Sequence, residues 1–158
     1  MIIHPINPHF DKNSRILILG SFPSVKSREV GFFYGHKQNR FWKVLSLVFG
    51  ENEPQTIDEK KEFLYRNRVA LWDVIASCDI EGSADSSIKN VVPNDLGIIL
   101  NNSKVEKIFV NGKTAEKYYN KYIKEKLKIT AICLPSTSPA NAVKKLDELV
   151  AEWSVIRL

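Results

Sequence analysis

The sequence is poor in the residues and motifs that mark several classes of protein. Two cysteines, Cys78 and Cys133, are too few for a disulfide framework or a four-cysteine metal cluster. The three histidines show no metal-ligand spacing, so no metal is expected. No apolar run approaches the roughly 20 residues that span a membrane, and the N-terminal residues do not resemble a signal peptide. The GxGxxG, GxxxxGK[ST] and GxSxG motifs of phosphate binding and acyl transfer are all absent.

The residues that are present predict one globular domain spanning residues 1–158. Hydrophobic residues make up 44% of the chain and charged residues 26%, and no repeat or linker is visible. The formal net charge of +5 favours a polyanionic partner without identifying it. We expect a monomeric, cytoplasmic protein that has reduced cysteines and no contact with a membrane.

Four short apolar runs rich in β-branched residues predict the buried strands of a parallel sheet. The runs are Arg15–Leu19, Val69–Trp72, Lys107–Val110 and Ile129–Leu134. Helical patterns alternate with them, at Arg40–Phe49, Ile57–Arg66, Asp95–Asn101 (capped by Asn94) and Thr114–Lys126. A last helix, opened by Pro139, buries Leu146, Leu149, Val150 and Trp153. The alternation predicts an α/β fold, a three-layer α/β/α sandwich with a central four-stranded parallel sheet.

Small polar residues, glycine or proline follow every predicted strand. These segments are Gly20–Ser24 (GSFPS), Asp73 with the residues after it, Asn111–Ala115 (NGKTA) and Leu134–Asn141 (LPSTSPAN). Ligands of such folds bind at the carboxyl ends of the strands, so a site is expected where the four segments meet. Taken singly, each also has a plain structural interpretation as a turn or a helix cap. The serine-rich segment equally suits phosphate binding by exposed N–H groups.

The segment Gly31–Trp42 (GFFYGHKQNRFW) is rich in aromatic rings and hydrogen-bonding side chains. It suits neither a strand nor a helix over its whole length, because Gly35 and the polar residues after it interrupt both periods. A lone histidine such as His36 is more often structural than catalytic. Rings, amides and small hydroxyls together suit a loop that stacks on a flat group and holds a phosphate chain.

Three stretches carry a resemblance to a known family. Gly20–Ser24 together with Gly31–Lys43 resembles the first motif of the uracil-DNA glycosylase superfamily, and Leu134–Asn141 resembles its second motif. Residues 70–88 and 107–115 resemble the hypoxanthine-DNA glycosylase branch. The resemblance runs from about Arg15 to Trp153. It implies a uracil-DNA glycosylase-like fold and a cofactor-independent enzyme that cleaves a deaminated base, chiefly hypoxanthine, from DNA and leaves an abasic site.

The resemblance also implies roles for single residues. Relatives that act on uracil commonly carry a water-positioning Asn or Asp where this sequence has Phe22; the hypoxanthine branch shares this loss and uses an Asn of the aromatic loop, here Asn39. Tyr34 falls where relatives place a ring against the flipped base, Phe22 lies beside that base, and Asp73 falls where a side chain reads the base edge. The expected DNA contacts are Ser24, Ser136, Thr137, Ser138 and Asn141.

Alternative functions remain open at this point. An ionised Asp73 accepts from the N1–H of hypoxanthine and rejects adenine, but uracil also offers an N–H beside a carbonyl. A uracil or mismatch glycosylase of the same fold is therefore an alternative. So is a non-catalytic lesion-binding domain, because Phe22 replaces a polar residue, although such a domain needs neither Asn39 nor Asp73. A small-nucleotide-binding domain is disfavoured by the missing glycine-rich motif.

Overall fold

The larger of two sheets carries the residues that the sequence analysis singles out. In the computed structural model, which describes residues 1–157, four parallel strands lie in the order β3-β2-β6-β7. Their bounds are Ile16–Gly20 for β2, Val69–Asp73 for β3, Lys107–Asn111 for β6 and Ala131–Leu134 for β7. The central strand β2 and its neighbour β3 are buried along their whole length, as strands that are apolar on both faces require. The predicted four-stranded parallel sheet is confirmed.

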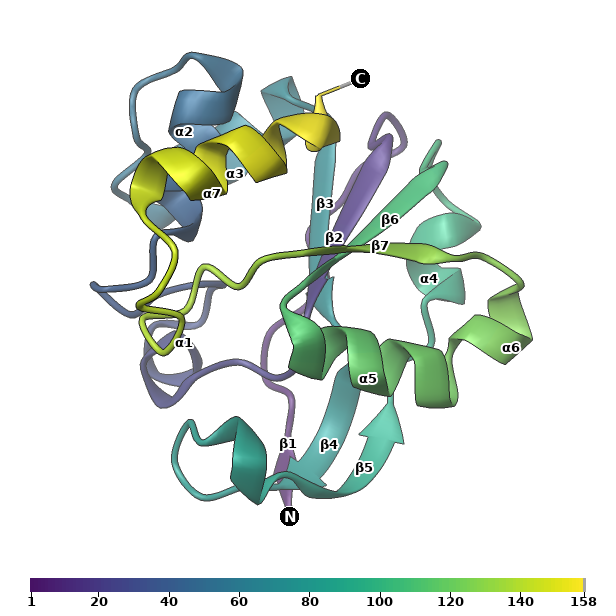
Figure 1. Ribbon diagram of the computed structural model, residues 1–158. Coiled ribbons are helices and arrows are strands. Elements are labelled where there is room, and N and C mark those ends of the chain that lie inside the picture. Colours follow the sequence, from purple (N-terminus) through teal and green to yellow (C-terminus); the bar gives the residue numbers. More distant parts are fainter. Residues whose placement is uncertain (158) are drawn as a thin grey trace.

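Helices cover both faces of this sheet and complete the predicted three layers. Figure 1 shows α2, α3 and α7 together on one side and α5 with α6 on the other. The helices are α1 (Val25–Val30), α2 (Phe41–Phe49), α3 (Ile57–Arg66), α4 (Gly97–Leu100), α5 (Lys113–Tyr122), α6 (Lys124–Leu127) and α7 (Leu146–Trp153). Helix α2 buries Phe41, Val44, Leu45 and Val48, the spacing of one helical face. Gly50, with φ of 67°, ends it in the left-handed conformation.

Three predicted helix boundaries are wrong. The last helix begins at Leu146 instead of Pro139. The backbone oxygens of Asn141 and Lys144 accept hydrogen bonds from the Arg40 guanidinium, so the chain between them stays irregular. The helix predicted over residues 114–126 is two helices, divided at Ile123. Asn94 does not cap α4; its side-chain amide donates to the backbone oxygen of Asp73 instead.

A second, antiparallel sheet was not predicted. Its strands are β1 (Ile2–Ile3), β4 (Ile75–Asp79) and β5 (Lys89–Pro93), in the order β1-β4-β5. Strand β4 follows β3 after one residue, so the N-terminal strand that pairs with β4 lies near the carboxyl end of β3 (Figure 1). The backbone N–H of His4 continues this pairing by donating to the oxygen of Ala76 at 2.8 Å. The small sheet therefore brings the start of the chain to the edge where a site is expected.

Candidate active site

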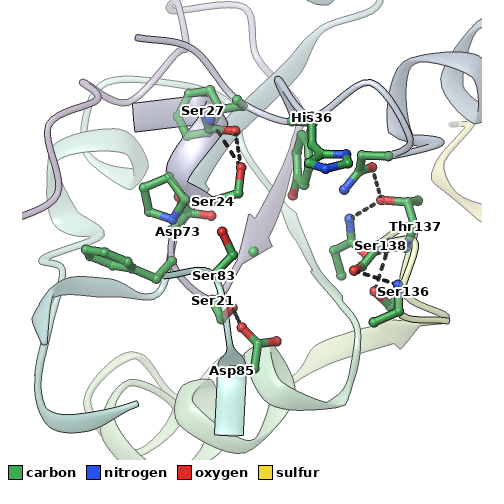
Figure 2. Close-up of a pocket in the computed structure, with 18 of the residues that line it drawn as sticks. Ser21, Ser24, Ser27, His36, Asp73, Ser83, Asp85, Ser136, Thr137 and Ser138 are labelled. Atoms are coloured by element: carbon green, nitrogen blue, oxygen red, sulfur yellow. Dashed lines mark hydrogen bonds between the residues drawn. The ribbon is translucent and has the colours of Figure 1, made fainter. Parts of the chain in front are cut away.

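The carboxyl ends of the strands and the aromatic loop enclose a pocket of about 460 Å³. Among the residues that line it are the predicted site residues Phe22, Ser24, Tyr34, Asn39, Asp73, Ser136, Thr137 and Ser138. Figure 2 shows Asp73 and Ser24 on one side of the pocket and Ser136 to Ser138 on the other. Asn141 lines an adjacent cavity instead. The sequence therefore identified one site from segments that lie far apart along the chain.

The amide of Asn39 has a fixed orientation. Its Oδ1 accepts from the backbone N–H of Phe41 at 2.9 Å and from the Thr137 hydroxyl at 2.8 Å. Because a backbone N–H can only donate, the atom that faces it must be the amide oxygen. Within residues 1–157 the Asn39 NH2 group has no hydrogen-bond partner, so this end of the amide is left to act on a ligand. Asn39 therefore offers the pocket a donor, not an acceptor.

Thr137 and Asn111 hold Asn39 in this orientation. The Asn111 amide donates to Thr137 Oγ1 at 3.0 Å and accepts from the Thr137 backbone N–H at 3.1 Å. Thr137 is fully buried, so its side chain is not placed to touch DNA as the sequence analysis expected. Its hydroxyl instead joins the two amides (Figure 2). Asn111 was not predicted; the only signal was its place directly after a strand.

Arg40 joins the aromatic loop to the segment 135–145, which we call the serine loop. The Arg40 backbone N–H donates to the oxygen of Thr137 at 3.1 Å. Its guanidinium donates to the backbone oxygens of Lys144 at 2.6 Å and Asn141 at 2.9 Å. The indole N–H of Trp153 in α7 donates to the oxygen of Pro135 at 2.9 Å. The serine loop is thus held at its start, middle and end.

The serine hydroxyls of the pocket differ in whether they already donate a hydrogen bond. Ser24 caps α1 by accepting from the Ser27 backbone N–H, and its Oγ lies 3.1 Å from the Ser27 Oγ to which it donates. Ser136 and Ser138 accept from the backbone N–H groups of Ser138 and Ala140, at 3.1 and 3.2 Å. In the part of the chain that is described, neither of these two hydroxyls donates. They are better placed than Ser24 to donate to a phosphate.

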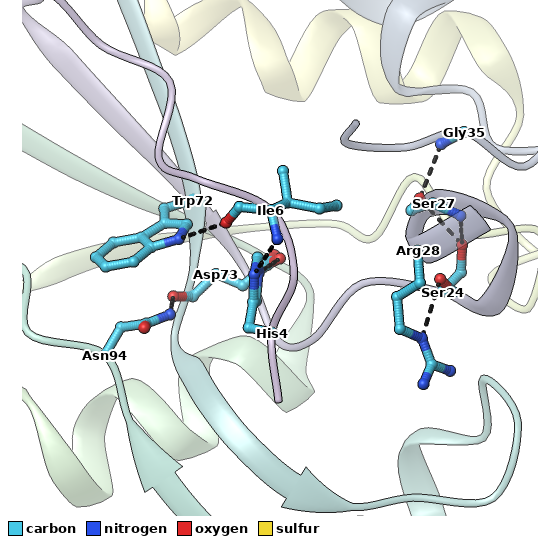
Figure 3. Close-up of polar contacts among 9 residues, drawn as sticks. All are labelled: His4, Ile6, Ser24, Ser27, Arg28, Gly35, Trp72, Asp73 and Asn94. Atoms are coloured by element: carbon cyan, nitrogen blue, oxygen red, sulfur yellow. Dashed lines mark hydrogen bonds and ion pairs between the residues drawn. The ribbon is translucent and has the colours of Figure 1, made fainter. Parts of the chain in front are cut away.

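Asp73 is a buried carboxylate held by a histidine. It is 3% exposed, and its Oδ2 lies 2.7 Å from His4 Nε2. His4 Nδ1 accepts from the backbone N–H of Ile6 at 3.1 Å, so the ring proton of a neutral imidazole must sit on Nε2 and point at Asp73 (Figure 3). The sequence predicted no role for His4, because it lies 69 positions from Asp73 and only the unpredicted second sheet joins them.

Gly20 forms the floor between Asp73 and Tyr34. A Cβ at this position would lie 2.5 Å from Asp73 Oδ1 and 3.1 Å from the Tyr34 hydroxyl, so only glycine fits. The Tyr34 ring stacks on Phe41 with centroids 3.9 Å apart. The Tyr34 hydroxyl is buried and has no hydrogen-bond partner among residues 1–157. Burial raises the pKa of Tyr34 far above its ordinary value, and the charge of Asp73 adds to this, so the hydroxyl keeps its proton.

Phe22 gives the pocket an apolar wall. It is 8% exposed, and the His4 ring meets it edge-on at a centroid distance of 5.7 Å. At the rim, burial raises the pKa of Asp85, and the nearby Asp73 charge acts in the same direction. His36 Nδ1 accepts from the backbone N–H of Gln38 at 3.1 Å. Figure 2 shows His36 and Asp85 at opposite ends of the pocket.

Residues 1–157 contain neither a candidate metal cluster nor a candidate membrane-spanning helix. No group of three or more His, Cys, Asp or Glu side chains within residues 1–157 is arranged to hold a metal ion. None of the helices in that range is long and apolar enough to cross a membrane.

Known proteins share both the sequence pattern and the fold. Residues 8–156 match the family model of the uracil DNA glycosylase superfamily. The chain is 38% identical over 148 residues to a hypoxanthine DNA glycosylase of Methanosarcina acetivorans, with 92% of each chain covered. It is 34% identical over 113 residues to a protein of the same name from Methanosarcina barkeri, covering 70% of this chain and 72% of the relative.

A solved structure extends the similarity to three dimensions. The solution NMR structure of a Methanosarcina acetivorans protein, assigned there to the uracil DNA glycosylases, superposes with a TM-score of 0.84 and 32% sequence identity. The match covers 99% of this chain and 98% of that one. The overall fold is therefore shared over nearly the full length of both chains.

Proposed function

Because the chain belongs to the uracil DNA glycosylase superfamily, we propose that it is a DNA glycosylase that removes deaminated bases, chiefly hypoxanthine, and leaves an abasic site. The naming of two relatives as hypoxanthine DNA glycosylases supports the substrate. The observation that carries the chemistry is a single pocket with the Asn39 amide and the Asp73 carboxylate among its lining residues and Phe22 as its apolar wall.

The base enters this pocket by leaving the DNA stack. Flipping a nucleotide costs a few kcal/mol, and stacking on an aromatic ring returns about 1–3 kcal/mol per base. Phe22, Phe33 and Tyr34 are among the aromatic residues that line the pocket, and we propose that Phe22 and Tyr34 contact the base. Asp73 Oδ2 is taken by His4, so Oδ1 is the atom that accepts from an N–H on the base edge. Adenine has no hydrogen on N1 and is excluded by this acceptor.

Asn39 acts by holding the water that attacks C1′. Its amide oxygen is already bonded twice, so the NH2 group donates to the water oxygen and leaves a second lone pair for attack. An amide is too weak a base to remove the proton, and its contribution is placement of the nucleophile. The sugar passes through an oxocarbenium-like state, as in other glycoside hydrolyses. We propose that backbone N–H groups near Phe22 stabilise the negative charge that develops on the departing base.

The serine loop and the net charge of the protein serve DNA binding. Ser136 and Ser138 present hydroxyls at the mouth of the pocket, and the formal net charge of +5 attracts the phosphate backbone. Ser24, which lines the same pocket, and Asn141, which lines the adjacent cavity, complete the proposed contacts. One chain supplies every residue of the site, and we propose that the protein acts as a monomer in the cytoplasm. Light scattering that finds a dimer at working concentrations would contradict the monomer.

Strand cleavage by alkali after incubation with defined duplexes tests the function. The duplexes contain deoxyinosine, deoxyuridine or no lesion, and each is treated with wild-type protein, Asn39→Ala and the control Asn120→Ala. Asn120 is exposed on α5, away from the pocket. We expect cleavage at deoxyinosine, a loss of about 100-fold or more in Asn39→Ala, and no change in the control.

The same experiment separates the alternatives. Uracil shares the N–H and carbonyl edge that Asp73 reads, so cleavage at deoxyuridine that equals or exceeds cleavage at deoxyinosine would assign the protein as a uracil glycosylase. Absence of cleavage on every duplex, with lesion binding retained, would leave a binding protein. An Asn39→Ala variant as active as wild type would remove Asn39 from the mechanism.

A further inference from the structure

His4 occupies one carboxylate oxygen of Asp73 and leaves the other to accept from a ligand. Both side chains are nearly inaccessible to solvent, at 3% and 5% exposed. The Ile6 N–H fixes the proton of the neutral His4 ring on Nε2, which donates to Asp73 Oδ2 at 2.7 Å. Aromatic side chains surround the His4 ring, with Phe22, Phe33 and Trp72 at centroid distances of 5.7, 6.3 and 6.5 Å. His4 therefore holds the carboxylate through Oδ2, and Oδ1 is the oxygen that faces Gly20 and the pocket.

Tyr34 places a donor beside this acceptor. Its hydroxyl lies over Gly20, next to Asp73 Oδ1, and no group within residues 1–157 accepts its hydrogen. The Asn111 side chain is near, but its hydrogen bonds are made with Thr137 and none joins it to the Tyr34 hydroxyl. A buried hydroxyl without a partner costs free energy, so a ligand that accepts from it is favoured. This points to a role for Tyr34 that differs from stacking, because it uses the hydroxyl and not the ring face.

We propose that Asp73 Oδ1 and the Tyr34 hydroxyl form an acceptor and donor pair that reads the N–H and C=O edge of a lactam base, and that His4 is the residue that positions the acceptor. The inference rests on the proposed function and extends it by a hydrogen-bonding role for Tyr34 and by a positioning role for His4. Hypoxanthine donates from N1–H to Asp73 and accepts at O6 from Tyr34. Adenine has the opposite polarity, an acceptor at N1 and a donor at C6, so both buried groups lose their partners.

Two substitutions separate this pair from stacking and from general structural effects. Tyr34→Phe keeps the ring and its contact with Phe41 and removes only the hydroxyl. His4→Leu removes the donor behind Asp73, whereas His4→Gln retains a side-chain N–H that can replace it. Each variant is compared with wild type in single-turnover release of hypoxanthine, in affinity for a duplex with a tetrahydrofuran abasic site, and in thermal melting. The tetrahydrofuran duplex has no base and reports only on DNA binding.

We expect hypoxanthine release to slow by about 10-fold in Tyr34→Phe and by about 10-fold or more in His4→Leu, as expected for lost hydrogen bonds to a buried site. Affinity for the tetrahydrofuran duplex should stay within about 2-fold of wild type, because these contacts involve the base alone. His4→Gln should recover part of the rate. Wild-type release in either Tyr34→Phe or His4→Leu overturns the proposal, as does an equal loss of tetrahydrofuran binding.

If His4→Leu does not fold, Tyr34→Phe decides alone, since it preserves the ring packing. Failure of the proposed function has a different signature. Wild-type protein that binds the tetrahydrofuran duplex but releases no hypoxanthine would refute the glycosylase assignment and this inference with it. Active wild-type protein with unaffected variants would refute only the inference.

Discussion

The two ends of the pocket are built on different principles. At the Asn39 end, the Asn39 amide oxygen, the Thr137 hydroxyl and the Asn111 amide are bonded to one another. At the Asp73 end, the Tyr34 hydroxyl has no partner in the described range 1–157. A closed network keeps its geometry without a ligand, which suits the placement of a nucleophile. An open donor next to an acceptor is completed only by the correct base, which suits recognition.

Among the substitutions that compare the two ends of the pocket, one that fills the Asp73 end should have the largest effect. In Gly20→Ala the added Cβ meets Asp73 Oδ1 at 2.5 Å, and the carboxylate is held from behind by His4 and cannot retreat freely. We expect hypoxanthine release to fall by about 100-fold, because small displacements at a reacting centre have effects of that size. Single-turnover kinetics measures this. Release within about 2-fold of wild type would show that the pocket floor is not in contact with the base.

Loosening the closed end should have an intermediate effect. Thr137→Val keeps the shape of the side chain but removes the hydroxyl that bonds both Asn39 and Asn111. We expect about 10-fold slower release and a loss of about 1–3 kcal/mol in the free energy of unfolding, because buried amide groups lose their partner. Thr130→Val, at an exposed position, is the matched control for kinetics and for denaturant unfolding. Full activity in Thr137→Val would show that Asn39 keeps its orientation without the network.

The smallest effect on activity should come from His9, a buried histidine outside the pocket. Unlike His4, its Nε2 has no partner within residues 1–157, and burial, with the charge of Lys61, lowers the pKa of His9 to about 4. As the pH falls, the His9 imidazole therefore becomes protonated near pH 6.5 in the unfolded chain but only near pH 4 in the folded protein. The contribution of His9 to the free energy of unfolding is therefore fully present above pH 6.5, and we expect it to fall by about 3 kcal/mol between pH 6.5 and pH 4.

Denaturant unfolding at a series of pH values measures the contribution of His9. In His9→Phe, whose ring can keep the contacts with Phe32 and Tyr65, this part of the pH dependence should disappear. Hypoxanthine release at neutral pH should not change. An unaltered pH dependence of stability in the variant would show that other groups are responsible.

The main sheet and much of the pocket were predictable because their signals are local. Each strand is a short apolar run, and the residues directly after the runs must meet at one sheet edge. That geometry and the family resemblance together placed Asn39, Asp73 and Tyr34 in one site. The resemblance also predicted the family and the fold, and the comparisons confirm both.

The rest was not predictable because it depends on contacts between distant segments. His4 and Asp73 are 69 positions apart, and strand β1, which brings them together, has only two residues. Nothing in LPSTSPAN distinguishes the buried Thr137 from its partly exposed neighbours Ser136 and Ser138. The start of α7 was misplaced for the same reason, since the guanidinium of Arg40 decides the path of the serine loop.

Arg40 has a consequence for the order of events on DNA. Arg40 follows Asn39 directly in the chain and forms three hydrogen bonds with the serine loop. A phosphate that displaces the serine loop would therefore also shift Asn39, which is only one peptide unit away. Thermodynamic linkage makes this coupling reciprocal. If DNA binding to the serine loop favours one orientation of Asn39, that orientation of Asn39 favours DNA binding by the same factor. The protein would then bind DNA most tightly when Asn39 is in the orientation that places the water.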